Sequence, residues 1–361
     1  MDLNPEALLV GRESRGLTQQ ALSEKAGITQ GRISKAEHGL TGMRPEEVEA
    51  ISKVLRYPTE FFYEPGRIRV AGTPCLFHRK RKTLPAKTLR RLDAVMAVRL
   101  INARRLMGDV VFDPSRIFHR FDPDEHGGPS ATAQALRRAW RMPAGPIRNV
   151  TALMESAAGM IFLEDFGTTK LMGMSSWERN VYPIFLLNSR MSTADLRWTI
   201  AHELGHLTMH HFPTEGDDPE AEADEFAGEF LAPEHEIRPT LRGLEYRQLP
   251  ALKSYWGLSM KGVITRASKL GAISKAQATK LYKQHSARGH TRVEPYELPH
   301  EPPTLAASAI QLHLSEHGYS VPELAFAVRL DPEELSILTG RTLPEGNQDP
   351  SNVVSLFPQR D

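Results

Sequence analysis

The sequence contains a single cysteine, Cys75, among its 361 residues. An intrachain disulfide is therefore excluded, and so is a metal site built from clustered cysteine thiolates. No apolar run approaches the roughly 20 residues needed to span a bilayer, and the first residues lack the basic and apolar segments of a secretory signal. Neither sign of charge dominates, since 45 Lys and Arg residues stand against 44 Asp and Glu residues. These absences predict a cytoplasmic protein without a membrane partner, in which histidine and carboxylate side chains bind any metal.

The residue pattern divides the chain into segments of different character, and its length is sufficient for two or three domains. We expect an α+β protein that is mostly helical, with an all-α domain at the N-terminus and a main domain in which a small sheet packs on helices. The predicted segments are the N-terminal domain at 1–65, a basic helical linker and connector at 66–145, the main domain at 146–290, and a small helical segment with a disordered tail at 301–361.

Two short helices predicted near the N-terminus are separated by a tight turn at Gly27. Leu22 and Ile33 fall on inward positions, while the polar side chains between them project outward. Glutamine suits the edges of adenine, and arginine or lysine suits guanine or phosphate, so this face matches the chemistry of the major groove. A homodimer is expected, because half-sites on DNA are normally bound by two copies of such a domain. The side chains expected to contact double-stranded DNA are Gln19, Thr29, Gln30, Arg32 and Lys35.

A basic stretch follows, with ten Lys or Arg residues and one acid, Asp93, between Arg79 and Arg105. Apolar residues recur there at helical spacing, which predicts an amphipathic helix within residues 78–106. Two interpretations are open: the basic side chains form the solvated face of a linker helix, or they extend a DNA-binding unit toward phosphates. The apolar stripe consists of Leu89, Leu92, Val95, Met96, Leu100 and Ala103.

Three short strands are predicted in the main domain, at residues 159–163, around 170–176 and at 182–187. Ser192, with Asp195 three residues later, has the pattern of a capping box and predicts a helix that runs to about residue 211. An acidic segment follows and leads into a further helix that is predicted to end near residue 233.

The first of these helices contains the pattern His202-Glu203-Leu204-Gly205-His206. At about 3.6 residues per turn, the two histidines lie one turn apart on one face, so both imidazoles can reach one ion. Glu203 is offset by about 100°, which suits a general base acting on water rather than a metal ligand. Histidine nitrogens, a carboxylate and an open fourth position form the ligand set of catalytic Zn²⁺. The pattern therefore predicts a zinc site with Glu203 as its catalytic residue.

The third zinc ligand has to come from elsewhere in the chain. Met209 and Phe212 stand where a three-histidine motif would need glycine and histidine. His210 lies ~12 Å from His202 along a straight helix and cannot share the ion. A carboxylate on the following helix is the remaining option.

That following helix offers three acids. Glu220 and Asp224 are one turn apart and share a face, so Glu220 is the expected ligand and Asp224 is expected to orient a ligand histidine. Glu222 is a rival ligand, although it points away from that pair. The structural alternative is that the acidic run is a solvated loop.

Segments around this pattern closely resemble the ImmA/IrrE metallopeptidase family: residues 198–206, residues 220–227 with their Glu-x-x-Ala-Asp-x-Phe-Ala element, and residues 230–233. The resemblance covers roughly residues 145–285 and implies a gluzincin-like core and the cleavage of a repressor protein to switch on genes. The ending Leu-Ala-Pro departs mildly from the Leu-Met-Pro of the family. The zinc ligands that the resemblance implies are His202, His206 and Glu220, with Glu203 as the catalytic base.

Residues 7–62 resemble the XRE (Cro/C1-type) repressor family and end in its Pro-Thr-Glu-Phe-Phe sequence at residues 58–62. The resemblance implies a helix-turn-helix fold and DNA binding, although such domains also serve as protein-interaction modules.

The leading hypothesis is a DNA-binding regulator with a zinc-dependent endopeptidase domain that cleaves a partner repressor or antitoxin in a stress response. One alternative is a non-enzymatic, antitoxin-like regulator whose zinc fold acts as a sensor or dimer platform. Another is self-cleavage in the connector at residues 109–146. A further hypothesis is that Cys75 caps the open zinc position and holds the peptidase latent.

Overall fold

The computed structural model describes residues 2–68, 84–108, 110, 114–177, 182–210 and 218–339. Its described part is mostly helical and contains one three-stranded sheet, which confirms the predicted fold class. Cys75, with its predicted role as a switch, and the predicted disordered tail lie outside these residues. Among the described helices, none combines the length and apolar character needed to cross a membrane.

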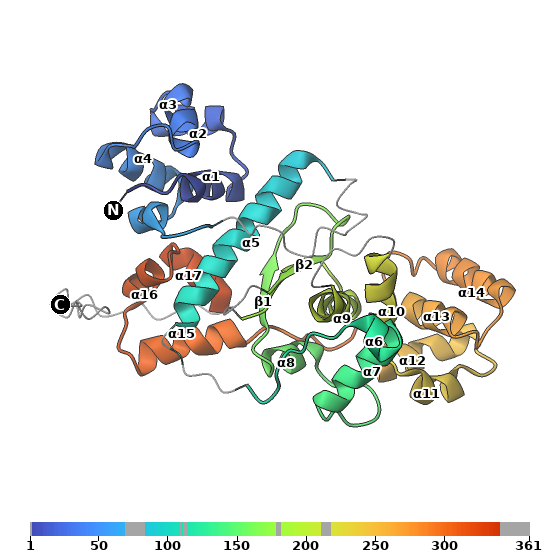
Figure 1. Cartoon of the computed structure of the whole chain (residues 1–361). Coiled ribbons are helices and arrows are strands. Elements are labelled where there is room, and N and C mark those ends of the chain that lie inside the picture. The colour runs from blue at the N-terminus through green and yellow to red at the C-terminus, as the bar shows by residue number, and fades with distance from the viewer. Residues whose placement is uncertain are drawn as a thin grey trace.

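The N-terminal unit is a cluster of short helices closed by a 3-10 turn (Figure 1). Thr18 caps the second helix by accepting a hydrogen bond from the amide of Ala21, and Gly27 ends it at a positive φ of 68°. The apolar positions of these helices converge on one core that includes Leu8, Leu22, Ile33, Ile51 and Phe61. The elements are α1 (Pro5–Ser14), α2 (Gln19–Ala26), α3 (Gln30–Glu37), α4 (Pro45–Leu55) and η1 (Thr59–Tyr63).

Helix α5 (Ala86–Met107) runs between this unit and the sheet (Figure 1). The apolar stripe predicted from the sequence packs against the sheet and the C-terminal helices. A second set of side chains, which the sequence analysis missed, enters the core of the N-terminal unit: Ala94, Ala97, Val98 and Ile101. A helix that is apolar on two sides is buried between its neighbours. Helix α5 therefore contributes buried side chains to two cores, one on each side of it.

The sheet has the strand order β1-β3-β2, with β1 (Met160–Glu164) parallel to β3 (Ile184–Asn188) and β2 (Gly173–Ser176) antiparallel to it. All three predicted strands are thus present. Side chains alternate across a strand, so Ile184 and Leu186 of β3 face the core on the α5 side. Phe185 and Leu187 face the opposite core, on the side of α9. The small sheet is consequently covered by helices on both faces.

The second core is built mainly by helices that follow or flank the sheet. Helix α7, which the sequence analysis assigned to the connector, packs against α10, and Trp140 directly after α7 is buried in this core. Part of the predicted connector therefore belongs to the main domain. The elements are α6 (Pro123–His126), α7 (Pro129–Ala139), α8 (Val150–Glu155), α9 (Thr193–Met209), α10 (Pro219–Leu231), α11 (Glu234–Ile237), η4 (Arg238–Leu241), η5 (Tyr246–Gln248), α12 (Leu249–Trp256), α13 (Met260–Lys269) and α14 (Lys275–Ala287).

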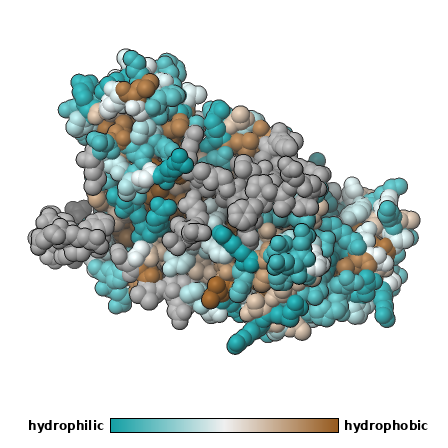
Figure 2. Space-filling view, viewed as in Figure 1, coloured by the Kyte–Doolittle hydropathy of each residue, from teal (hydrophilic) through white to brown (hydrophobic). Residues whose placement is uncertain are grey.

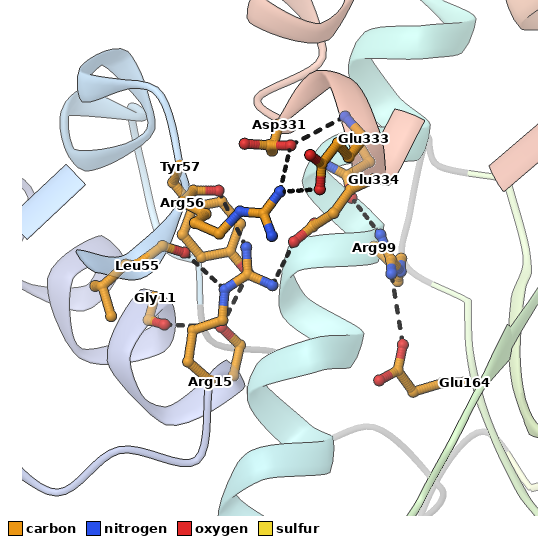
Figure 3. Close-up of polar contacts among 12 residues, drawn as sticks. Gly11, Arg15, Leu55, Arg56, Tyr57, Arg99, Glu164, Asp331, Glu333 and Glu334 are labelled. Atoms are coloured by element: carbon orange, nitrogen blue, oxygen red, sulfur yellow. Dashed lines mark hydrogen bonds and ion pairs between the residues drawn. The ribbon is translucent and has the colours of Figure 1, made fainter. Parts of the chain in front are cut away.

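The C-terminal helices α15 (Leu305–Ser315), α16 (Val321–Ala327) and α17 (Pro332–Thr339) pack on α5 and also reach the N-terminal unit. Figure 3 shows the polar contacts at this junction. The Arg56 guanidinium lies 2.9 Å from a carboxylate oxygen of Asp331 and 2.6 Å from one of Glu333, and Arg15 lies 2.5 Å from Glu334. Partly exposed pairs of this kind contribute little stability each, and they connect α17 and the residue before it to the N-terminal unit.

Candidate metal centre and nucleic-acid interface

Helix α9 carries the predicted metal-binding pattern and begins as expected. The Ser192 side chain accepts a hydrogen bond from the amide of Asp195, and the helix ends at Met209, two residues before the predicted end. Gly205 lies where α10 crosses α9, and a Cβ atom there would come within 3.1 Å of the Phe226 ring. The glycine between the two histidines therefore permits the close approach of the helix that carries the acidic residues.

His202, His206 and Glu220 converge at this crossing. The Nε2 atoms of the two histidines are 3.1 Å apart, and the Glu220 carboxylate lies 3.3 Å from His206 Nε2 and 3.8 Å from His202 Nε2. The three ligand atoms all lie within 4.8 Å of one another. Ligand atoms at zinc distances in a tetrahedral site are about 3.3 Å apart. The nitrogen and oxygen donors and their spacing thus fit one zinc ion.

Asp224 lies where the sequence analysis expected it, behind the first histidine. Its Oδ1 is 3.0 Å from His202 Nδ1, so the carboxylate holds the ring with Nε2 directed at the ion site. Burial raises the pKa of Asp224, but the hydrogen bond to His202, together with the charges of His202 and Lys269, more than offsets this, and the pKa lies below its ordinary value. The carboxylate is therefore charged when it orients His202.

His210, itself bound by Glu222, orients the ring of His206 as Asp224 orients that of His202. The sequence analysis missed this role. His210 Nδ1 is 2.9 Å from His206 Nδ1, and the Glu222 carboxylate is 2.8 Å from His210 Nε2. Glu222 therefore contacts His210 and not the ion site. Burial lowers the pKa of His210, although Glu222 opposes this shift, which favours the neutral ring. The spacing of four residues between His206 and His210 could have indicated this contact, because it places both side chains on the same face of the helix.

We expect the His210→Ala variant to bind zinc about 10- to 100-fold more weakly, because loss of a group that orients a ligand histidine typically has that effect. A competition titration against a chromophoric chelator measures the change. His235→Ala is the matched control, since the His235 side chain is 71% exposed. An unchanged zinc affinity in His210→Ala would remove His210 from the organisation of the site.

Glu203, the predicted base, is fully buried between α9 and β2. Its Oε2 accepts a 2.7 Å hydrogen bond from the hydroxyl of Ser175 on β2. A Cβ atom at Gly173, two residues earlier, would lie 2.6 Å from the Thr199 side chain, so glycine allows β2 to approach the helix. The sequence analysis did not identify Ser175, because its contact depends on the position of a strand relative to a distant helix.

On the N-terminal unit, the predicted DNA-contacting residues surround the start of α3. The side-chain amide of Gln30 donates to Gln19 at 2.7 Å, and that of Gln19 donates to the buried Glu37, also at 2.7 Å. Arg12 holds the same Glu37 with two hydrogen bonds. Thr29, Gln30 and Lys35 are exposed. This network fixes the Gln19 and Gln30 side chains relative to each other at the surface.

Arg32, which was expected to project outward, also has partners within the N-terminal unit. Its guanidinium is bound by both carboxylate oxygens of Glu47, at 3.1 and 2.8 Å, and by the Thr41 hydroxyl at 3.0 Å. The hydrogen bond from Arg32 lowers the pKa of Glu47 to about 2. The structure therefore gives Arg32 a contact between α3 and α4, while its side chain stays 31% exposed, and its contact with DNA remains a prediction.

Comparison with known families matches both units of the chain. Residues 155–268 match the model of the IrrE N-terminal-like domain, and residues 11–62 match that of the helix-turn-helix. Both resemblances inferred from the sequence are thereby confirmed. A comparison with curated proteins found no match.

The chain thus joins an XRE-type helix-turn-helix DNA-binding domain to an IrrE/ImmA-like peptidase domain. The matched segment of the peptidase domain includes α9 and most of the helices around it, and so it contains the residues that converge on the candidate metal centre.

Proposed function

We propose that this protein is a DNA-binding transcription regulator whose second domain is a zinc-dependent endopeptidase. Its substrate is a partner repressor or antitoxin, cleaved in a stress response in the cytoplasm, and the protein binds operator half-sites as a homodimer. The observation that carries the proposal is the convergence of two histidines and Glu220 beside the buried carboxylate of Glu203. A site that only held the chain together would need the three ligands but not this fourth group.

In this mechanism, His202, His206 and Glu220 hold the zinc ion. A zinc ion held there would supply Lewis acidity toward water and toward the carbonyl of the scissile peptide. Glu203 accepts the proton from the attacking water and returns it to the nitrogen of the leaving amine. The hydroxyl of Ser175 donates a 2.7 Å hydrogen bond to Oε2 of this carboxylate and so helps to fix its orientation. Asp224 and His210 orient the rings of His202 and His206 toward the ion site.

The packing of the two domains supports a link between DNA binding and proteolysis. Helix α5 contributes to the core of the N-terminal unit on one side and to the core against the sheet on the other. A change in either domain that moves α5 is therefore transmitted to the other through packed side chains.

The proposal predicts that zinc-loaded full-length protein, incubated with the repressor encoded nearest to its own gene, cleaves that repressor at one position. Intact-mass spectrometry should show two fragments whose masses add up to the repressor plus one water. Protein treated with a chelator should leave the repressor intact. Fragments of the regulator itself would instead show self-cleavage. If zinc is bound and neither protein is cut, the non-enzymatic alternative is favoured.

A further inference from the structure

A cleft of about 520 Å³ lies between the start of α2 and the first turns of α5. Four basic side chains and one carboxylate line it, and among its described lining residues Leu17 alone has a hydrophobic side chain. Pockets for small organic ligands are predominantly apolar, so the lining points to an anionic ligand instead. The lining residues are Arg12, Glu13, Gly16, Leu17, Thr18, Gln19, Gln20, Gln30, Lys87, Arg90 and Arg91.

The basic side chains of the cleft differ in how they are held. Arg12 is bound by Glu37, and Arg91 donates to the carbonyl of Asp165 at 2.6 Å, so both have structural partners. Lys87 and Arg90 are exposed, and the Arg90 side chain is 59% exposed with Glu13 3.8 Å away. These two cations are the ones positioned to meet a ligand from solvent.

The placement of Lys87 runs against local helix electrostatics. The first turn of α5 contains no acid and carries this lysine. The N-terminus of a helix is its positive end, where acidic side chains are favoured and cations are not. Sequences break such local preferences mainly at functional sites. Lys87 is therefore not placed where it stabilises the helix.

We propose that Lys87 and Arg90 of α5 bind backbone phosphates of the DNA strand that passes the start of α2. The inference rests on the proposed DNA binding and extends it, because α5 lies outside the segment matched as a helix-turn-helix. Gln19 and Gln30 line the same cleft and are hydrogen-bonded to each other. The phosphate contacts thus continue the predicted base-contacting surface without a break, which favours DNA over a separate small anion.

The rigid attachment of α5 makes this surface preformed. Ala94, Ala97 and Val98 of α5 are buried in the core of the N-terminal unit, one to three turns beyond the two cations. The ion pairs in Figure 3 hold the same unit to the C-terminal helices, which also pack on α5. Hydrophilic side chains cover most of the visible face of the N-terminal unit in Figure 2. A preformed surface binds its ligand without the cost of ordering it.

The test is the salt dependence of binding to a labelled random-sequence duplex of about 30 base pairs, measured by anisotropy between roughly 50 and 200 mM NaCl. Each phosphate contact contributes about 0.9 to the slope of log K against log [salt]. The Lys87→Gln/Arg90→Gln variant of the full chain should therefore show a slope that is shallower by roughly 1.8, with affinity at low salt reduced on the order of tenfold or more.

The matched control is Lys280→Gln/Arg242→Gln, which removes the same charge from exposed positions in the peptidase domain. Its slope should equal that of the unchanged protein. An equal slope in the Lys87/Arg90 variant, with DNA binding intact in the unchanged protein, overturns the cleft proposal and leaves the proposed function standing. Absence of duplex binding by the unchanged protein overturns the DNA-binding function itself. A third outcome involves inorganic pyrophosphate as a probe. If pyrophosphate raises the melting temperature of the unchanged protein but not of the Lys87/Arg90 variant, and the salt slope of duplex binding is the same in both, the cleft binds a small anion. That result also overturns the proposal.

Discussion

The Glu203→Gln variant should lose peptide hydrolysis almost completely while it keeps zinc and its fold. General acid–base catalysis by a positioned side chain contributes about 10²- to 10⁴-fold to a rate, and a neutral amide cannot accept the proton from water. Glutamine has the same shape, and its amide oxygen can still accept the hydrogen bond from Ser175. The substitution therefore removes the proton-accepting carboxylate of a fully buried side chain without leaving a cavity. The rate of substrate cleavage, followed by mass spectrometry, measures the loss.

Two measurements separate this result from a folding defect. The zinc content, obtained by elemental analysis, should remain one ion per chain, because Glu203 is not one of the three converging ligands. Glu125→Gln, a change of the same kind at an exposed position on α6, should cleave at the normal rate. Cleavage by Glu203→Gln at a comparable rate would exclude Glu203 as the base.

The Arg197→Met variant should lose about 3–5 kcal/mol of stability toward unfolding, because removing one partner of a buried ion pair leaves the other charge without compensation. Arg197 on α9 and Glu301 are paired, with side chains only 4% and 6% exposed. The guanidinium also donates to the carbonyls of Ile147, at 2.6 Å, and Gly257, at 2.9 Å. Glu301 accepts from the amide of Val150 at 2.7 Å. Urea denaturation of the full chain, followed by circular dichroism, measures the loss.

The control for this prediction is Lys53→Met, which breaks an exposed pair with Glu49 one turn away on α4. The two side chains are 74% and 60% exposed, and such pairs contribute about 0.3–0.5 kcal/mol. The double variant Arg197→Met/Glu301→Leu should recover part of the loss, because no buried charge then remains alone. A loss below about 1 kcal/mol in Arg197→Met would show that this pair does not hold the C-terminal segment to the peptidase domain.

The predictions that agree with the structure rest on short-range periodicity. His202 and His206 lie on one face because a helix repeats about every 3.6 residues, and the same rule brings Glu220 and Asp224 onto one side of α10. The three strands and the capped start of α9 also follow from local patterns of apolar and capping residues. In each case the residues concerned lie within one helix or strand, so the local pattern is enough to place them.

The contacts that the sequence analysis missed join elements whose relative placement is set by packing. Ser175 reaches Glu203 only because β2 is the edge strand beside α9. Arg32 binds Glu47 because α4 packs beside α3, a contact that the position of Arg32 on its own helix does not reveal. In α5, small residues such as Ala94 and Ala97 form the second buried face, and small apolar residues give a weak signal in a basic helix.

The sequence by itself determined that His202 and His206 share one helix face, because a helix repeats about every 3.6 residues. Its motifs were also sufficient to indicate both families, which the family comparisons then confirmed. The tertiary structure decided what surrounds that pattern: the hydroxyl of Ser175 on the base, the chain from Glu222 through His210 to His206, and the position of Lys87 and Arg90 beside α2. Each of these depends on how helices and strands distant in the sequence pack together, and that packing results from the burial of many side chains at once rather than from any local pattern.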